Sequence, residues 1–313
     1  METQGIPAVS LKGPVLATTI YGNLALRHFG DLDILVHKRD IPSAEDLFIS
    51  QGYRLTAQLR GADGDTIPQE YGFDPREAAY LDPKYYIFTS DDGRVRVDLQ
   101  WRITRRSFSF SLDTEYLWER AEPLSFAGTT VLTFPPEDLL LILCVHGCKH
   151  HWRQLKWICD VAELVCVRKR VDWGRALERA GAQGGRRMCA IGLLLAHDLL
   201  GMNLSEEVLR KIRVDSVAKS AATQFRQQLF SDVGDSSPDF QNFAFNLRLR
   251  ERLRDRVRYR LYYLGQCLCT AAIPNAKDQA LLPLPAFLTF LYYLLRPIRL
   301  LGECGLSLLR RLP

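Results

Sequence analysis

The chain has 313 residues, of which 47% are hydrophobic and 25% are charged, and its formal net charge is +5 at pH 7. This ordinary balance excludes an intrinsically disordered chain, and the length suffices for two hydrophobic cores of normal domain size. The eight cysteines are irregularly spaced, and five of them lie in apolar helical patterns. That pattern is typical of buried thiols in a reducing compartment and not of a disulfide framework. The first residues lack the basic and apolar regions of a secretion signal, so we expect a cytoplasmic protein.

The N-terminal part has the pattern of a small α/β unit. Residues 6–11 predict a first strand, and Pro14 indicates a helix start because its fixed φ and missing N–H suit the first turn. We expect this helix to end near Gly30 and a second strand to span residues 31–36. A further helix should then end at Gly52, where glycine favours a helix stop.

A polar, glycine-containing loop is predicted over residues 61–72, followed by a β-hairpin. Residues 85–89 and 94–101 have strand-forming composition, and Asp92-Gly93 between them predicts a type I′ turn. Apolar residues alternate along the second of these strands. This alternation puts Asp98 on the opposite face of the strand from the apolar side chains.

The remainder of the chain predicts helices. After a strand at residues 129–134, the pair Pro135-Pro136 interrupts the pattern, so we place a domain boundary there, with an α/β domain over residues 1–134 and a helical domain over residues 135–313. Helical periodicity occurs over residues 137–152, 155–169, 172–180, 186–200, 206–211, 216–229 and 246–265.

The uncharged stretch 279–295 contains two prolines and is shorter than the roughly 20 apolar residues of a membrane span. We therefore predict a buried C-terminal helix and no transmembrane segment. The alternative is association with a membrane surface, because basic residues lie beside leucine-rich turns at Arg296, Arg299, Arg310 and Arg311.

The positive charge is concentrated in one segment. From Arg248 to Arg260 every even position is arginine, and these seven arginines with Glu251 and Asp255 give a net +5. Apolar residues recur at helical spacing within and just beyond the segment, at Leu249, Leu253, Val257, Leu261 and Leu264. We favour a solvated helix face whose arginine stems cover this apolar stripe. The alternative is a ridge that binds nucleic acid or a membrane, and for nucleic acid the support is weak because tyrosines occur only at the end of the segment.

Three aspartates stand out as metal-ligand candidates. In a strand over residues 31–36, Asp31 and Asp33 emerge on one face about 7 Å apart. Asp98 supplies a third carboxylate from another strand. Mg²⁺ prefers oxygen ligands, and carboxylates can hold a pair of such ions against nucleotide phosphates.

The order of these features resembles a known family. A turn with Lys12-Gly13 lies between strand and helix, Asp31-x-Asp33 lies on the next strand, and Asp98 lies on a later strand. In this order they resemble the bacterial nucleotidyltransferases of the DNA polymerase β superfamily, and the Leu-Lys-Gly start resembles an uncharacterised branch of it. The resemblance also covers residues 44–53 and 146–164, about half of the chain.

This resemblance implies a fold and a reaction. The fold would be α+β, with a polymerase β-like nucleotidyltransferase domain of mixed sheet and flanking helices followed by an all-helical domain. The enzyme would use two Mg²⁺ ions to transfer a nucleoside monophosphate from an NTP such as ATP to a hydroxyl acceptor, with release of pyrophosphate. The acceptor, which the sequence does not identify, would be a protein, a small molecule or an RNA end. An alternative is a catalytically degenerate nucleotide-binding or scaffold protein of a biosynthetic system.

The resemblance also assigns roles to single residues. Asp31, Asp33 and Asp98 would be the catalytic metal ligands, Lys12 would neutralise the triphosphate, and Gly13 would allow close backbone approach at a helix N-terminus. This turn departs from the superfamily, which usually has Gly-Gly or Gly-Ser there. Arg27 would either contact phosphate or pair with Asp31 and orient it.

A histidine pair in the helical part has three interpretations. His146 and His150 are four residues apart on one helix face, with Cys144 and Cys148 nearby. A zinc site would need a second ligand pair at zinc spacing, which the sequence lacks. Packing in the core with a polar lining is the ordinary alternative. Functionally, the two histidines would face the nucleotide base or the acceptor, together with residues that follow them: Trp152, Lys156 and Asp160.

Overall fold

The computed structural model describes residues 1, 4–58, 85–104, 108, 110, 112–230, 239–272, 285, 288, 291–295 and 298. The chain divides into two compact units, Met1–Arg256 and Val257–Pro313. The loop predicted over residues 61–72 and most of the helix predicted over residues 279–295 lie outside the described residues. Within the described part, no helix is both long and apolar enough to cross a membrane.

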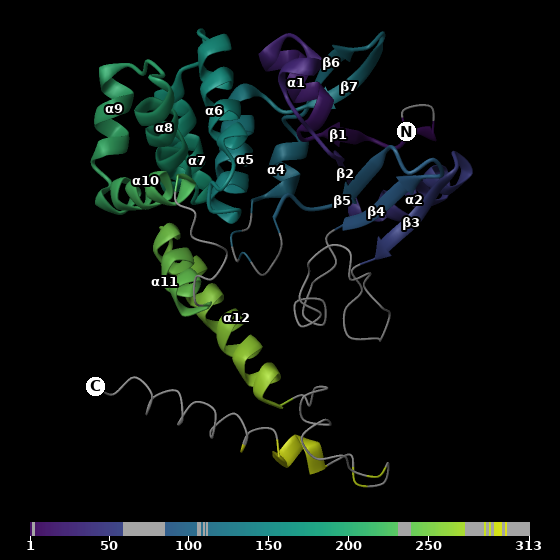
Figure 1. Cartoon of the computed structure of the whole chain (residues 1–313). Helices are drawn as coiled ribbons and strands as arrows, with labels where there is room; N and C mark the ends of the chain where they lie inside the picture. The colour runs from purple at the N-terminus through teal and green to yellow at the C-terminus, as the bar shows by residue number, and fades with distance from the viewer. Residues whose placement is uncertain are drawn as a thin grey trace. The chain divides into compact units, whose positions relative to one another are not determined.

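A mixed sheet forms the N-terminal half of the first unit (Figure 1). Among the described residues it has seven strands in the order β3-β4-β5-β2-β1-β7-β6. The central strand β2 runs antiparallel to β1 and parallel to β5. The strands are β1 (Ala8–Ser10), β2 (Leu32–Val36), β3 (Tyr53–Gln58), β4 (Tyr85–Ser90), β5 (Arg96–Gln100), β6 (Glu122–Phe126) and β7 (Thr129–Thr133).

Helices flank the sheet and predominate in the described chain after it, which confirms the predicted α+β class. In the sheet half they are α1 (Gly13–Tyr21), the 3-10 turns η2 (Leu24–Leu26) and η3 (Lys38–Asp40), α2 (Ile41–Ser50) and α4 (Thr114–Trp118). After the sheet come α5 (Pro136–Lys149), α6 (Leu155–Val167), α7 (Trp173–Gln183), α8 (Arg186–Leu200), α9 (Glu206–Arg213), α10 (Ser216–Leu229), α11 (Asp239–Leu249) and α12 (Leu253–Ala272).

Two local predictions are wrong for reasons of backbone geometry. The helix that begins at Gly13 ends at Tyr21 and not near Gly30, because Gly22 adopts a left-handed φ of 71° and closes the helix with a hydrogen bond to the Thr18 carbonyl. The β4-β5 hairpin is present, but its turn is not type I′. A type I′ turn needs a positive φ at both of its central residues, and of Asp92 and Gly93 only Gly93 has a positive φ.

The two faces of the sheet pack against different cores. One face carries a cluster with Val36, Val97, Leu99 and Trp101, which also includes Ala44 of α2. The opposite face contributes sheet residues to a much larger cluster that continues through the helices from α5 to α10. This core is continuous across residue 134, where strands give way to helices as expected. The status of that position as a domain boundary stays a prediction.

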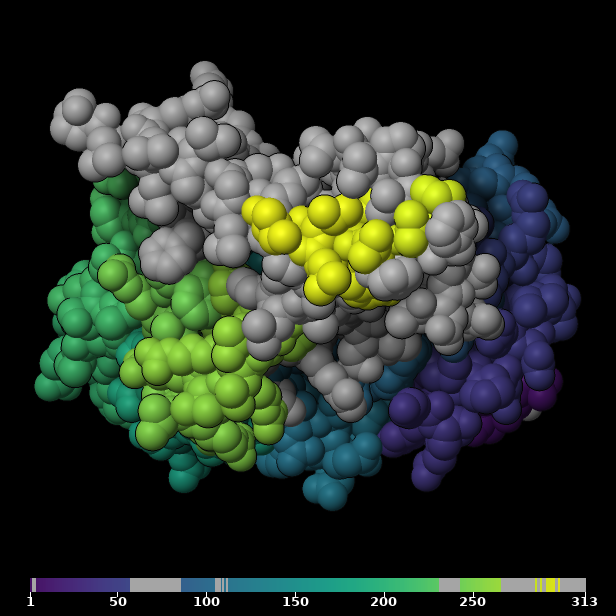
Figure 2. Space-filling view, turned by 90° about the horizontal axis from the view of Figure 1, so that it is seen from below, coloured from purple at the N-terminus to yellow at the C-terminus, as the bar shows by residue number. Residues whose placement is uncertain are grey.

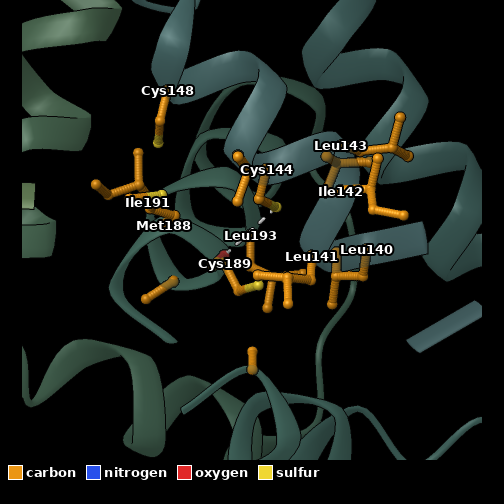
Figure 3. Packing of buried hydrophobic residues seen from close by; sticks show 14 of the residues in the cluster. Leu140, Leu141, Ile142, Leu143, Cys144, Cys148, Met188, Cys189, Ile191 and Leu193 are labelled. Atoms are coloured by element: carbon orange, nitrogen blue, oxygen red, sulfur yellow. Dashed lines mark hydrogen bonds between the residues drawn. The ribbon is translucent and has the colours of Figure 1, made fainter. Parts of the chain in front are cut away.

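Three cysteine side chains belong to the larger core. Cys144 and Cys148 of α5 and Cys189 of α8 are buried free thiols among leucine and isoleucine side chains (Figure 3). Burial raises the pKa of Cys148 to about 12, so this thiol is uncharged at neutral pH. The prediction of buried thiols is confirmed for these three, whereas Cys166 is exposed.

The arginine-rich helix predicted over residues 246–265 is in fact two helices, α11 and α12. Arg250, 1% exposed, separates them, and its guanidinium donates to the carbonyls of Asn246 and Phe108. Arg252 donates to the carbonyls of Gly181 and Ala182. These two arginines therefore satisfy backbone carbonyls of the first unit and are not part of a solvated face.

Candidate active site

The residues predicted from the sequence to act together line a single cavity of about 650 Å³. Its walls come from the turn between β1 and α1, the segment before β2, the strands β2 and β5, and the helices α5 and α6. All of the predicted residues are among its lining: Lys12, Gly13, Arg27, Asp31, Asp33, Asp98, His146 and His150.

Asp33 and Asp98 are neighbours across the sheet. Strands β2 and β5 are parallel, and their register pairs Asp33 with Asp98. Paired residues on adjacent strands point to the same face, about 5 Å apart. This face is the one opposite to the buried Val97 and Leu99, because side chains alternate along a strand.

The three carboxylates influence one another electrostatically. Burial raises the pKa of Asp98, and the charges of Asp33 and Asp31 raise it further, against the opposing effect of Arg96. Arg96 Nε lies 3.0 Å from Asp98 Oδ1. Asp98 thus interacts electrostatically with both other aspartates, so the three carboxylates lie close enough to affect one another's ionisation.

Lys12 occupies a central position in this site. Its Nζ lies 2.9 Å from Asp33 Oδ2 and 3.2 Å from His146 Nδ1. The other oxygen of Asp33 accepts a hydrogen bond of 3.1 Å from Gln100 Nε2. The lysine therefore connects the sheet carboxylates to helix α5.

The described residues contain no group of three or more His, Cys, Asp or Glu side chains placed together so that they could hold a metal ion. In this state Asp33 pairs with Lys12 and Asp98 pairs with Arg96. The zinc interpretation gains no support, because Cys144 and Cys148 are buried in the core while His146 and His150 line the cavity.

Gly13 has a clear structural requirement. Its φ of 64° lies in the left-handed region, and a Cβ atom there would lie 3.4 Å from the carbonyl oxygen of Asp31. A side chain at this position is strained, since only glycine adopts such a φ at no cost. The glycine thus allows the first turn of α1 to approach the segment that carries Asp31.

Arg27 pairs with a carboxylate that the sequence did not suggest. Its Nε and one terminal nitrogen donate to the two oxygens of Asp160 at 2.7 and 2.9 Å, and the Tyr21 hydroxyl donates to the same carboxylate at 2.8 Å. Burial by itself would lower the pKa of Arg27, but the hydrogen bond and charge of Asp160 raise it. Of the two roles expected for Arg27, pairing with Asp31 is replaced by this buried link to α6, and contact with phosphate stays a prediction.

The helical wall of the cavity is aromatic and cationic. The rings of His146 and His150 lie 4.6 Å apart, and both lie within 5.4 Å of the Trp157 ring. Lys149 and Lys156 line the same wall. This arrangement brings stacking surfaces and positive charge opposite the carboxylates.

Trp152 does not face the cavity, contrary to expectation. It is fully buried, and its ring packs so closely on Gly147 that a Cβ atom there would collide with it, while a Cβ atom at Gly192 would be in tight contact with the ring and would collide with Cys144 Sγ. Asp160 is also buried, where it binds Arg27. Of the three residues expected to follow the histidines into the cleft, only Lys156 lines it.

Sequence reasoning missed several lining residues, among them Gln100, Lys149 and Trp157. Gln100 could have been found, since it follows Asp98 by two positions and so shares its strand face. Trp157 could not have been found, because the chain is not helical between the end of α5 and the start of α6. Left-handed φ values at His151 and Trp152 interrupt the helical periodicity there.

Comparison with known proteins identifies a family. Residues 1–201, nearly two thirds of the chain, match the model of a family described as "Uncharacterised nucleotidyltransferase". All of the cavity-lining residues fall within this range. No curated protein and no solved structure matches the chain.

Proposed function

Because this chain belongs to a family of uncharacterised nucleotidyltransferases, we propose that its cavity transfers a nucleoside monophosphate group from an NTP to a hydroxyl acceptor, with release of pyrophosphate. The observation that carries the proposal is the parallel pairing of Asp33 with Asp98 at a cavity that Asp31 and Lys12 also line. Carboxylates on one side and cations on the other suit a site for phosphates.

The residues fit a pair of divalent ions by their chemistry. Asp31, Asp33 and Asp98 offer only carboxylate oxygens, which hard cations such as Mg²⁺ prefer. Burial, and after it the charges of Asp33 and Asp31, raise the pKa of Asp98 against the effect of Arg96, and a bound cation would stabilise the charged form of such a carboxylate. When bound, such ions would stabilise the attacking and leaving oxygens of an in-line displacement.

Lys12 and the α1 N-terminus would bind the triphosphate. The Lys12 ammonium already lies in the cavity, and the first turn of α1 begins beside it. Helix N-termini attract anions through free amides and the helix dipole. On nucleotide binding, Lys12 would exchange part of its contact with Asp33 for contact with phosphate.

Asp98 would act on the acceptor side. A carboxylate with a raised pKa accepts a proton more readily than an ordinary one. Its carboxylate would therefore take the proton from an acceptor hydroxyl, while Arg96 holds the carboxylate in position. The ring surfaces of His146, His150 and Trp157 would contact the base or the acceptor.

We place this reaction in the cytoplasm, in line with the buried free thiols of α5 and α8. The direct test incubates the purified protein with each α-labelled NTP, Mg²⁺ and cell extract, and then separates protein, nucleic acid and small molecules. Label in one fraction identifies the acceptor class. Absence of label with every NTP, together with retained NTP binding, would exclude the transferase.

A specific observation favours a second candidate, a nucleotide-binding or scaffold protein without turnover. Both sheet carboxylates are paired with basic side chains, and Lys12-Gly13-Pro14 replaces the usual glycine-rich turn. If these pairs persist, metal ions would not enter. In that case neither the wild type nor Lys12→Ala would show turnover. An active transferase, in contrast, would lose activity on the same substitution.

A further inference from the structure

Helix α12 carries an apolar stripe that is exposed instead of buried. Leu253, Val257, Leu261 and Leu264 have exposed fractions of 72%, 42%, 64% and 54%. Each residue turns an α-helix by about 100°, so these four side chains fall within a sector about 80° wide. The sequence predicted that this stripe would be covered by arginine stems, and that prediction is wrong for these residues.

The opposite face of α12 is buried. Asp255 and Tyr259 are 3% and 8% exposed, and the helical repeat places them about 180° from the centre of the leucine stripe. The helix therefore has a face that is already packed and a second, apolar face that is open. Atoms of this part of the chain (light green) lie at the surface in Figure 2.

Arginines border the open stripe on both sides. At about 100° per residue, Arg254 and Arg258 fall on one flank and Arg256 and Arg260 on the other. Arg254, Arg258 and Arg260 are exposed. Arg250 and Arg252, which bind backbone carbonyls of the first unit, are not counted among these flanking arginines.

We propose that α12 is a membrane-surface helix that docks the protein onto anionic lipid. A helix with an apolar stripe flanked by basic residues lies in the interface with its apolar face in the boundary between headgroups and acyl chains. Each basic residue near an anionic bilayer surface adds about fivefold to the affinity.

The combination of features favours lipid over other partners. Nucleic acid would engage the arginines but would gain nothing from the leucine stripe. A bilayer uses both, because its headgroups bind the guanidinium groups and its apolar boundary removes the leucines from water. This proposal is independent of the transferase reaction.

The test measures flotation of the full-length protein with vesicles. Phosphatidylcholine vesicles that contain phosphatidylglycerol should bind the protein, pure phosphatidylcholine vesicles should not, and salt should weaken the binding. Leu261→Gln with Leu264→Gln should reduce the partition coefficient about tenfold or more, because two leucines no longer enter the apolar boundary. Arg258→Gln with Arg260→Gln should reduce it by about tenfold or more.

Matched controls come from exposed residues elsewhere on the chain. Leu26 and Ile49 are 64% and 54% exposed, the same fractions as Leu261 and Leu264. Their double substitution by Gln should leave vesicle binding unchanged. Arg39→Gln with Arg94→Gln is the charge control, since both side chains are highly exposed.

Several outcomes would overturn the proposal. The first is either no binding to anionic vesicles or a loss of binding in the control variants equal to that in the α12 variants. The second is a change in oligomeric state by light scattering on Leu261→Gln with Leu264→Gln without vesicle binding, which would assign the stripe to contact between copies of the chain. The third is binding to labelled RNA or DNA in preference to vesicles, lost with the arginine variant and kept with the leucine variant, which would assign the helix to nucleic acid.

Discussion

The buried ion pair between Arg27 and Asp160 provides a test of how the site is anchored. The two side chains are only 5% and 1% exposed, and two nitrogen atoms of the guanidinium contact both carboxylate oxygens. Arg27→Ala would leave the Asp160 charge in the core without the guanidinium, and among the described residues the Tyr21 hydroxyl would still donate to it. Breaking a buried pair in this way costs about 3–5 kcal/mol of unfolding free energy.

The assay is urea unfolding of a double-mutant cycle. Each single variant, Arg27→Ala and Asp160→Ala, should lose about 3–5 kcal/mol. The double variant should lose much less than the sum, because no unpaired charge remains. The matched control is the exposed pair Arg54 and Asp91, each 69% exposed with a separation of 3.0 Å, for which Arg54→Ala should cost no more than about 1 kcal/mol.

Two results would refute this reasoning. Additive losses in the Arg27 and Asp160 cycle would mean that the two side chains do not stabilise the fold as a pair. A loss for Arg27→Ala no larger than that for Arg54→Ala would mean that burial does not strengthen the link. Either result would remove the argument that α6 holds the segment before Asp31 in place.

The remaining predictions concern the carboxylates and the turn. Asp98→Asn should lower turnover about 100-fold or more while NTP affinity in a filter-binding assay changes little, since the acceptor-side contact acts in the transition state; equal loss of affinity would contradict this. Mg²⁺ with an NTP should raise the melting temperature of the wild type and raise it much less in Asp31→Asn with Asp33→Asn, and equal shifts would place binding elsewhere. Because the pKa of Asp98 is raised, the folded state holds the Asp98 proton more tightly than the unfolded state does. The contribution of Asp98 to stability therefore falls as pH rises from the ordinary carboxyl pKa of about 3.9 through the raised value. The Asp98→Asn protein should lack this contribution in a series of melting temperatures against pH, and identical series for variant and wild type would refute the prediction. Gly13→Ala should cost about 1–2 kcal/mol in urea unfolding, because its φ of 64° is left-handed, and an unchanged midpoint would show that the turn relaxes without cost.

The local sequence determined much of the fold. Two helices, α8 and α10, span the residues predicted from their periodicity. The first ends at Gly201, whose left-handed φ closes it, and the second begins after Asp215, whose side chain accepts from the amides of Val217 and Ala218. Such caps act over one turn of helix, so a short window of sequence contains them.

Alternation along the strands likewise determined which face each aspartate occupies. Asp98 lies opposite Val97 and Leu99, as the period of two requires. Only the tertiary structure decided that β2 pairs with β5 in the register that places Asp33 beside Asp98. Strand order depends on contacts between residues far apart in the chain, and no local pattern specifies them.

The contacts of buried side chains also depended on the tertiary structure. Arg27 is four residues from Asp31 in sequence but binds Asp160, which lies 133 residues away. Trp152 is next to the histidines in sequence but fills space beside Gly147 and Gly192. A buried charge needs a partner that offsets its loss of hydration, and a large ring needs a space that fits it. Both exist only once the sheet and the helices have packed together.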